Sequence, residues 1–314
     1  MIAEHRAKGP TVVLDAGDAL FRDFLAVPGE AEKAQARLLL EGMGEMGTAA
    51  FAVGDRDLAA GLDWLVREAA RAKVPLLAAN LVRADGSRPF APSRLVEAGE
   101  SRVGVIGLWG GGKLPEGLQA GDFRAAAKTE AERLRAQGAT LVVALVHGAS
   151  SQATDVASIA GIDFAIPSHE GSPSEPFQAG QDRGWVAGAG QRGRTLLRLA
   201  VHPAGAGPLV DEAAAERLVR ERDYLRTRLA DSEKRAATAD EQMKKALEKA
   251  RAMQQKRIAE LDARIASAPK AEGRRFSSAN VALGAAVADE PELGERVNEF
   301  LRAHGDAPAA KAKH

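Results

Sequence analysis

Short apolar runs rich in β-branched residues alternate with amphipathic segments along residues 11–206, and this alternation constrains the fold more than any other feature. It is the pattern expected when helices cover a largely buried sheet. The apolar runs predict strands at residues 11–16, 49–54, 75–80, 102–108, 140–147, 163–166 and 195–201. The segments between them predict helices at residues 30–46, 57–72, 124–137 and 150–160. The sequence therefore predicts an α/β domain.

The composition changes after Gly207-Pro208, because residues 209–268 contain neither glycine nor proline and are dense in Ala, Glu, Lys, Arg and Leu. That composition is typical of long helices. Apolar residues recur in a nearly three-four alternation from Leu218 and then shift phase at Ile258. One continuous helix, as in a coiled coil, and an antiparallel hairpin both fit this pattern, and we favour the hairpin.

The remaining residues form a third part of the predicted organisation. A loop is expected to run from Pro269 through Phe276, followed by an amphipathic helix at residues 291–304. Residues 305–314 are rich in Ala and Lys, which predicts a disordered tail. The predicted domains are residues 1–206, the helical arm 207–270, and the short helix with its tail, 271–314.

Charge and cysteine content restrict the kind of site that this chain can build. Lys and Arg balance Asp and Glu at 43 each, so no overall field favours nucleic acid, and we predict no nucleic-acid partner. The sequence has no stretch of 18 or more apolar residues, so we predict no transmembrane segment. Because the chain has no cysteine, any metal ligands must be His, Asp, Glu or Asn side chains.

Aspartates follow two of the predicted strands. Residues 13–18, VLDAGD, are an apolar run ending in a glycine turn that places Asp18 at the carboxyl end of the strand. Residues 46–58, MGTAAFAVGDRDL, have a similar form and place Asp55, Arg56 and Asp57 after the strand. We interpret Asp57 as a helix N-terminal residue, because the free N–H groups there favour carboxylates.

Histidines follow two later strands. His147 ends the apolar run LVVALVH, and His169 follows the strand predicted at residues 163–166. Between the two pairs of motifs lies a glycine-rich turn at residues 110–113, GGGK, which lacks the spacing of a phosphate-binding loop. We interpret that segment as a flexible turn and not as a phosphate-binding loop.

In this order, and together with residues 74–81 and 102–108, the motifs resemble metallophosphoesterases of the 5′-nucleotidase and 2′,3′-cyclic phosphodiesterase type, in the calcineurin-like phosphoesterase superfamily. The resemblance covers residues 10–205 and is limited to the N-terminal domain of that family. It implies a four-layer α-β-β-α sandwich, to which the long-helix arm is a C-terminal appendage.

The resemblance also implies roles for individual residues. Asp18 corresponds to the aspartate that bridges two metal ions, and Asp55 stands where the family usually has an asparagine ligand. Arg56 stands where the family has a histidine that protonates the leaving group or steadies the phosphate. Gly171 stands in place of the last ligand histidine. The family's opening Asp-x-His has no counterpart here, and one explanation left open is that the chain lacks the family's first strand.

These departures remove the ligands of one metal and keep those of the other. The second metal of the family would be held here by Asp18, Asp55, His147 and His169. Two carboxylates and two imidazoles suit one divalent metal, Mn²⁺, Fe²⁺ or Zn²⁺. The alternative is that these groups are vestigial and bind no metal.

We therefore expect a degenerate metallophosphoesterase with weak or no phosphate-ester hydrolysis, whose ligand is a phosphate-containing small molecule contacted by Arg56. The alternative is a non-catalytic scaffold that binds a protein partner or self-associates through residues 209–268. Family resemblance implies the periplasm. However, residues 1–6 lack the apolar run of a signal peptide, which leaves the cytoplasm open.

Overall fold

The computed structural model describes residues 1–24, 26–236, 241–266, 273–284 and 287–305. The chain divides into two compact units, one formed by Met1–Arg198 with Ala279–His314 and the other by Leu199–Ser278. None of the described helices combines the length and the apolar character needed to cross a bilayer. The two units are described separately below.

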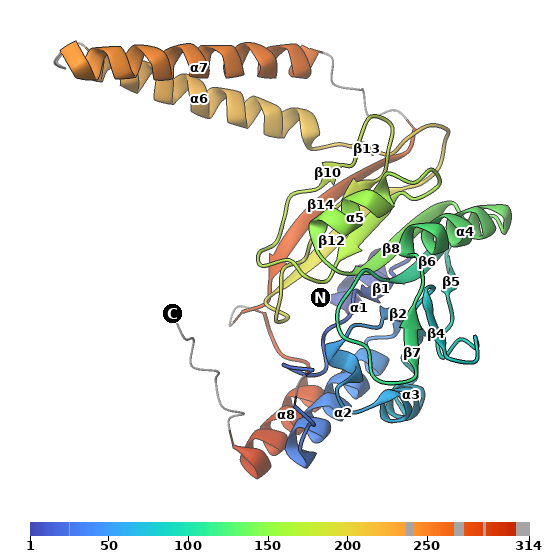
Figure 1. Cartoon of the computed structure of the whole chain (residues 1–314). Helices are drawn as coiled ribbons and strands as arrows, with labels where there is room; N and C mark the ends of the chain where they lie inside the picture. The colour runs from blue at the N-terminus through green and yellow to red at the C-terminus, as the bar shows by residue number, and fades with distance from the viewer. Residues whose placement is uncertain (25, 237–240, 267–272, 285–286, 306–314) are drawn as a thin grey trace. The chain divides into compact units, whose positions relative to one another are not determined.

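Two sheets form the centre of the first unit (Figure 1). The smaller sheet is parallel, in the order β1-β2-β3, with strands Val13–Asp15, Thr48–Ala52 and Leu76–Leu77. The larger sheet has the order β10-β11-β9-β8-β6-β5. Its strands are Phe177–Gln178, Trp185–Val186, Phe164–Pro167, Leu141–His147, Ser101–Trp109 and Ser93–Ala98. The four inner strands are mutually parallel, and both edge strands are antiparallel to their neighbours.

Helices cover the outer face of each sheet and complete four layers. Helices α2 (Glu30–Glu45) and α3 (Leu62–Arg71) share a buried apolar cluster with β2, in which Leu40, Phe51 and Leu65 are fully buried. Helices α4 (Phe123–Ala136) and α5 (Ser150–Ala157) share a second cluster with β6, β8 and β9. Strand β2 packs against β6 and β8, so the two sheets face each other between the helical layers.

The described structure confirms the predicted α/β fold, and each predicted strand up to residue 201 overlaps an observed one. The helix predicted at 57–72 was placed too early. A short 3₁₀ turn, η1 (Arg56–Leu58), comes first, and α3 begins only after Gly61, whose φ of 94° interrupts the helix. Sequence patterns also missed several elements that are short or lie at an edge: α1 (Ile2–Lys8), β4 (Leu81–Arg83), β5, β7 (Leu118–Ala120) and β10.

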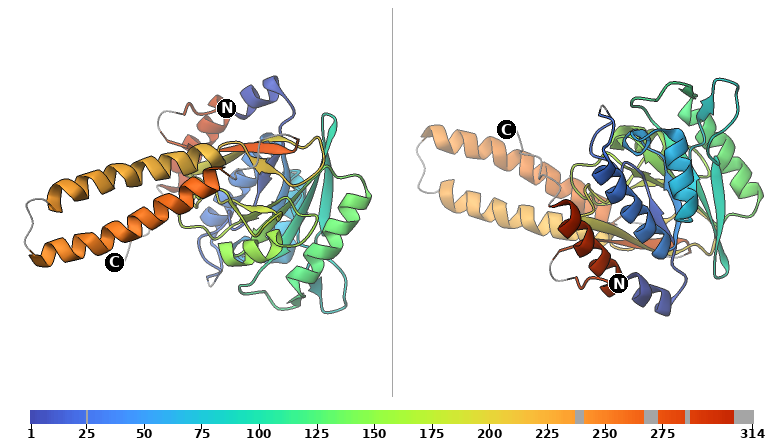
Figure 2. Two further views of the ribbon diagram at one scale, coloured as in Figure 1. Left: turned by 90° about the horizontal axis from the view of Figure 1, so that it is seen from above. Right: turned by 90° about the horizontal axis from the view of Figure 1, so that it is seen from below.

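The second unit contains two long helices, as the composition predicted. Helices α6 (Ala214–Ala236) and α7 (Glu241–Ala266) lie side by side in every view (Figures 1 and 2). They run antiparallel, because only four residues separate Ala236 from Glu241, too few to return along the roughly 35 Å length of α6. Ion pairs join the two helices, Arg226 with Asp262 and Arg257 with Glu221. The arm is therefore a helical hairpin and not one continuous helix.

Leu261 gives the hairpin region its clearest apolar anchor. It is fully buried, whereas Met253 on the same helix is largely exposed. We expect Leu261→Ala to lower the free energy of unfolding of the second unit by about 2–4 kcal/mol, because truncation leaves a cavity. Met253→Ala should change it by less than about 0.5 kcal/mol. Urea denaturation followed by circular dichroism at 222 nm compares the two, and equal effects would contradict this assignment.

The segment after the hairpin differs from the prediction. The loop expected through Phe276 contains strand β14 (Arg275–Ala282), which pairs with β12 (Thr195–His202) and β13 (Val210–Asp211) in the order β12-β14-β13. Phe276 is the only buried residue of this eight-residue strand, and one apolar anchor gives too little periodicity to be recognised in the sequence. The division of the chain at residues 206 and 270 stays a prediction.

The predicted C-terminal helix is present as α8 (Pro291–His304) and belongs to the first unit. It packs on α2, where Arg296 forms ion pairs with Glu41 and Glu45 at 3.4 and 2.5 Å. Leu293 of α8 packs over Gly42 of α2. Apart from Gly305, the predicted disordered tail, residues 305–314, lies outside the described residues.

Candidate metal centre

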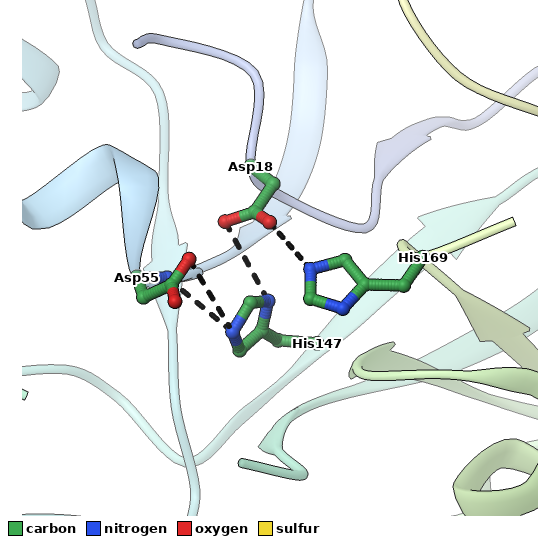
Figure 3. Close-up of side chains that lie close together, drawn as sticks. All are labelled: Asp18, Asp55, His147 and His169. Atoms are coloured by element: carbon green, nitrogen blue, oxygen red, sulfur yellow. Dashed lines mark hydrogen bonds and ion pairs between the residues drawn. The ribbon is translucent and has the colours of Figure 1, made fainter. Parts of the chain in front are cut away.

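Four strand ends bring the four predicted ligands to one place. Asp18 follows β1 and Asp55 follows β2 in the small sheet, His147 is the last residue of β8, and His169 follows β9 in the large sheet. Carboxyl ends of parallel strands meet at one edge of a sheet, and here the edges of two facing sheets adjoin. Figure 3 shows the four side chains pointing toward one another. One donor atom from each residue can be chosen such that all lie within 4.8 Å of one another.

Asp18 is at the centre of the cluster. Its Oδ2 lies 2.5 Å from His169 Nε2, and its Oδ1 lies 3.6 Å from His147 Nδ1. His147 Nε2 lies 4.0 Å from Asp55 Oδ1 (Figure 3). The Asp18 and His147 side chains are 5% and 0% exposed, whereas that of His169 is 39% exposed. The cluster is therefore buried on one side and reachable from the other.

Glycines make the turns around Asp18 fit together. Gly17 has a φ of 91°, and a Cβ on it would overlap the carbonyl oxygen of Ala52 in β2. A Cβ on Gly54 would overlap Asp18 Oδ1 and lie 2.9 Å from His147 Nδ1. Both positions require glycine because backbone and ligand side chains approach closely there. The glycines in the VLDAGD and VGDRD motifs therefore allow the ligand side chains to gather.

Asp57 fixes the backbone of both ligand turns, a role that sequence reasoning missed. Its carboxylate is fully buried and accepts N–H bonds from Asp18 and Gly54 at 2.8 Å, from Ala19 at 3.0 Å and from Leu20 at 3.1 Å. These bonds hold Asp18 at a φ of 61°, a left-handed conformation that is uncommon for a residue other than glycine. The interpretation of Asp57 as a residue at a helix N-terminus was incomplete, because its bonds join two turns 37–39 residues apart.

The electrostatics of the cluster favour a cation. Burial alone would raise the pKa of Asp18, but the hydrogen bond with His169 and the nearby His147 hold it below its ordinary value. The same hydrogen bond raises the pKa of His169, while burial lowers the pKa of His147. Burial, together with the Asp18 charge, raises the pKa of Asp57 to about 8. A divalent cation at Asp18 would offset the negative charge that now draws a proton to His169.

The residues present fit a divalent metal. Carboxylate oxygens and imidazole nitrogens are ordinary ligands of Mn²⁺, Fe²⁺ and Zn²⁺, and four such donors match a compact coordination set. The ring of Trp109 lies 4.5 Å from that of His147, centroid to centroid, and Ser168 Oγ lies 3.4 Å from His147 Nδ1. These contacts restrict the orientation of the His147 ring, as supporting residues do around metal ligands. Nothing in the sequence distinguished Trp109 and Ser168 from ordinary strand-end residues.

Arg56 lies beside the cluster but is not one of its donors. Its backbone N–H donates to Asp18 Oδ1 at 3.2 Å, and its Nε lies 3.7 Å from Asp18 Oδ2. The side chain is 45% exposed. Gly171, at the position of the missing ligand histidine, has no atom within 4 Å of the place where a Cβ would stand. Among the described residues, no second group of three or more candidate metal donors gathers.

Comparison with known proteins supports the fold. No protein-family model and no curated protein matches the sequence. Among solved structures, sulfate thiohydrolase SoxB from Thermus thermophilus aligns with a TM-score of 0.55 and 21% identity, over 64% of this chain and 38% of that chain. A 5′-nucleotidase precursor, also from Thermus thermophilus, aligns with a TM-score of 0.51 and 23% identity, over 64% and 43%.

The calcineurin-like phosphoesterase YfkN from Bacillus subtilis aligns with a TM-score of 0.51 and 21% identity, over 63% of this chain and 73% of that chain. This chain thus spans about two fifths of the length of SoxB and of the 5′-nucleotidase precursor. The N-terminal 64% of the chain therefore has the fold of 5′-nucleotidases and calcineurin-like phosphoesterases.

Proposed function

We propose that this chain holds one divalent cation at Asp18, Asp55, His147 and His169 and binds a phosphate-containing small molecule beside it. The observation that supports this most is the convergence of four candidate donors from four strand ends. Mn²⁺, Fe²⁺ and Zn²⁺ fit the donor set. When bound, such an ion supplies positive charge that offsets the negative charge of phosphate oxygens.

Arg56 is the proposed phosphate contact. It follows Asp55 directly, stands 3.7 Å from Asp18, and exposes nearly half of its side chain. A guanidinium group offers paired N–H donors that match two phosphate oxygens. The partial neutralisation of Asp18 by His169 leaves Arg56 free to contact a second anion.

We expect hydrolysis of phosphate esters to be weak or absent. Arg56 cannot serve as a general acid, because a guanidinium group does not give up a proton to a leaving group near neutral pH. Lack of general acid catalysis alone typically costs on the order of 10²- to 10⁴-fold in rate. Two-metal phosphoesterases use ions about 3.5–4 Å apart to stabilise both the attacking and the leaving oxygen. The described residues form only one candidate metal-binding group.

Phosphate binding to the Mn²⁺-loaded protein tests this function. We expect inorganic phosphate to bind only in the presence of the metal, and Arg56→Gln to weaken phosphate binding by roughly 10-fold through loss of a charged hydrogen bond. Arg67→Gln is the matched control, because Arg67 is exposed on α3 and pairs with Glu68. Metal-independent phosphate binding, or equal effects of the two variants, would contradict the proposed role of Arg56.

Metal binding should release at least one proton near neutral pH. In the metal-free protein, Asp18 keeps His169 protonated to a pH above the ordinary histidine pKa, and a cation must displace that proton. His147 adds little, because burial lowers its pKa. The affinity for Mn²⁺ should therefore rise with pH until it passes the pKa of His169, and then level off.

Calorimetry in buffers with different ionisation enthalpies counts the released protons. His169→Gln should lower the count by about one proton relative to the wild type. His202→Gln, which replaces an exposed histidine on β12, should leave the count unchanged. A metal affinity that does not change with pH would contradict this electrostatic description.

A second candidate function concerns the hairpin of α6 and α7. Tyr224 and Met253 are 59% and 68% exposed there, so a partner docked on the hairpin could bury both side chains. We propose as the alternative that the hairpin binds a protein partner or a second copy of the chain. Light scattering tests self-association, and binding measurements on the double variant Tyr224→Ala with Met253→Ala test partner binding. This candidate would be ruled out if the protein is a monomer at high concentration and the double variant keeps all interactions of the wild type.

A further inference from the structure

The glycine-rich turn at residues 110–113 lies against the candidate metal centre, although no sequence pattern connects the two. The turn follows β6 and is fixed at its start. Gly110 N–H donates to the carbonyl oxygen of His147 at 2.7 Å, and Gln152 Nε2 donates to the carbonyl oxygen of Gly110 at 2.6 Å. The start of the turn is thus bonded to the same strand end that presents His147.

Gly112 is the residue of this turn at which an added side chain would crowd the ligands. A Cβ built on Gly112 would lie 2.8 Å from Asp55 Oδ2 and 3.2 Å from His147 Nε2. These are donor atoms on two of the four candidate ligands. A bound divalent cation lies about 2.0–2.2 Å from such oxygen and nitrogen atoms. A carbon atom held within 3.2 Å of both donors would therefore compete with the cation, or with a phosphate oxygen on it, for the same space.

The cluster is enclosed by backbone on a second side as well. Gly54 stands where a Cβ would overlap Asp18 Oδ1 and approach His147 Nδ1. The most exposed members of the site are His169 and Arg56, with 39% and 45% of their side chains exposed. A ligand bound beside Asp55 and His147 would therefore lie next to the turn. The space for this ligand exists because residue 112 has no side chain.

We propose that Gly112 is a specificity-determining residue that leaves room for a divalent cation and a phosphate oxygen against Asp55 and His147. This inference rests on the proposed function, because it concerns access to the same cation. It goes further by assigning a role to a turn that supplies no ligand. The chemistry that the space admits is a small metal ion with an oxyanion, and a methyl group at position 112 excludes it.

Gly111 provides a matched control. Gly111 and Gly112 have φ angles of 147° and 121°, so alanine at either position is strained in a similar way. The two positions differ in their surroundings, because a Cβ on Gly111 would meet only Gln152 Nε2, at 3.7 Å. Backbone strain is therefore common to Gly111→Ala and Gly112→Ala, while crowding of the ligands is specific to Gly112→Ala.

The experiment measures Mn²⁺ affinity by calorimetry for the wild type, Gly112→Ala and Gly111→Ala, and then phosphate affinity at saturating Mn²⁺. We expect Gly112→Ala to weaken Mn²⁺ binding by roughly 10-fold or more, in the range of changes next to metal ligands, and Gly111→Ala by less than about 3-fold. Thermal unfolding in EDTA should show equal melting temperatures for the two variants, because both change the same turn.

Three results would overturn the inference: Mn²⁺ binding by Gly112→Ala as tight as that of the wild type, equal weakening in both variants, or a melting temperature in EDTA lowered only in Gly112→Ala. The last two would assign the effect to backbone strain or to folding. Failure of the proposed function looks different, because there the wild type itself would bind no Mn²⁺.

Discussion

Asp18→Asn is expected to weaken Mn²⁺ binding by roughly 100-fold or more, the largest effect of any single substitution at the site. Asp18 touches both histidines of the cluster and is 5% exposed, so no neighbouring carboxylate can take its position. Asparagine preserves the size of the side chain and tolerates the positive φ of residue 18 better than alanine does. The change therefore removes the charge while conserving the local backbone.

Calorimetric titration with Mn²⁺ gives the affinity, and Asp63→Asn is the control. Asp63 is an exposed aspartate in the first turn of α3, and its replacement should leave metal affinity within about 2-fold of the wild type. The Asp18 variant should also release fewer protons on metal binding, because His169 loses the partner that raises its pKa. Unchanged Mn²⁺ affinity in Asp18→Asn would remove Asp18 from the ligand set.

Asp57→Asn is expected to lower the free energy of unfolding of the metal-free protein by about 2–4 kcal/mol. The buried carboxylate accepts four backbone N–H bonds. The amide nitrogen of asparagine cannot accept the bonds that the carboxylate oxygen in its place accepted. At least one buried N–H group is then left without an acceptor. Above about pH 8, loss of the buried negative charge offsets part of this cost, since burial and Asp18 raise the pKa of Asp57 to about 8.

The pH dependence of stability distinguishes this effect from simple loss of packing. The folded-state pKa of Asp57 lies above its unfolded value, so the folded metal-free protein binds the extra proton between about pH 4 and 8. The stability contributed by this group is full below that window and falls as the pH rises through it. Asp57→Asn should therefore flatten the decline in unfolding free energy between about pH 5 and 8.

Urea denaturation in EDTA across this pH range measures both quantities. Asp122→Asn is the matched control, because Asp122 also accepts two backbone N–H bonds, at the exposed start of α4. Asparagine caps a helix about as well as aspartate does, so the control should change stability by less than about 0.5 kcal/mol. Equal losses in the two variants would contradict the special role given to Asp57.

The sequence was sufficient to predict those features that depend only on residue type and on position within a strand. Periodicity located β1, β2, β3, β6, β8 and β9. The family resemblance implied that Asp18, Asp55, His147 and His169 form one ligand set, and the structure brings these four residues together. A parallel arrangement brings such ends together whatever the exact register of the strands is. Composition likewise predicted the long helices α6 and α7.

The residues that sequence reasoning missed act through close approach in three dimensions. The role of Asp57 depends on N–H groups 37–39 residues away, and that of Gly112 depends on its distance from Asp55 and His147. Neither distance follows from a local pattern. Strand β14 was missed for a related reason, since its pairing with β12 joins segments about 80 residues apart.

The stoichiometry of metal binding tests the central claim most directly. After dialysis against excess Mn²⁺ and removal of free metal, elemental analysis of the wild-type protein should give one Mn per chain, and Asp18→Asn with His147→Ala should give none. One ion per chain is expected because the described residues gather a single set of four donors. A wild-type chain that retains no Mn²⁺, Fe²⁺ or Zn²⁺, or one that retains two ions, would contradict the single-metal site.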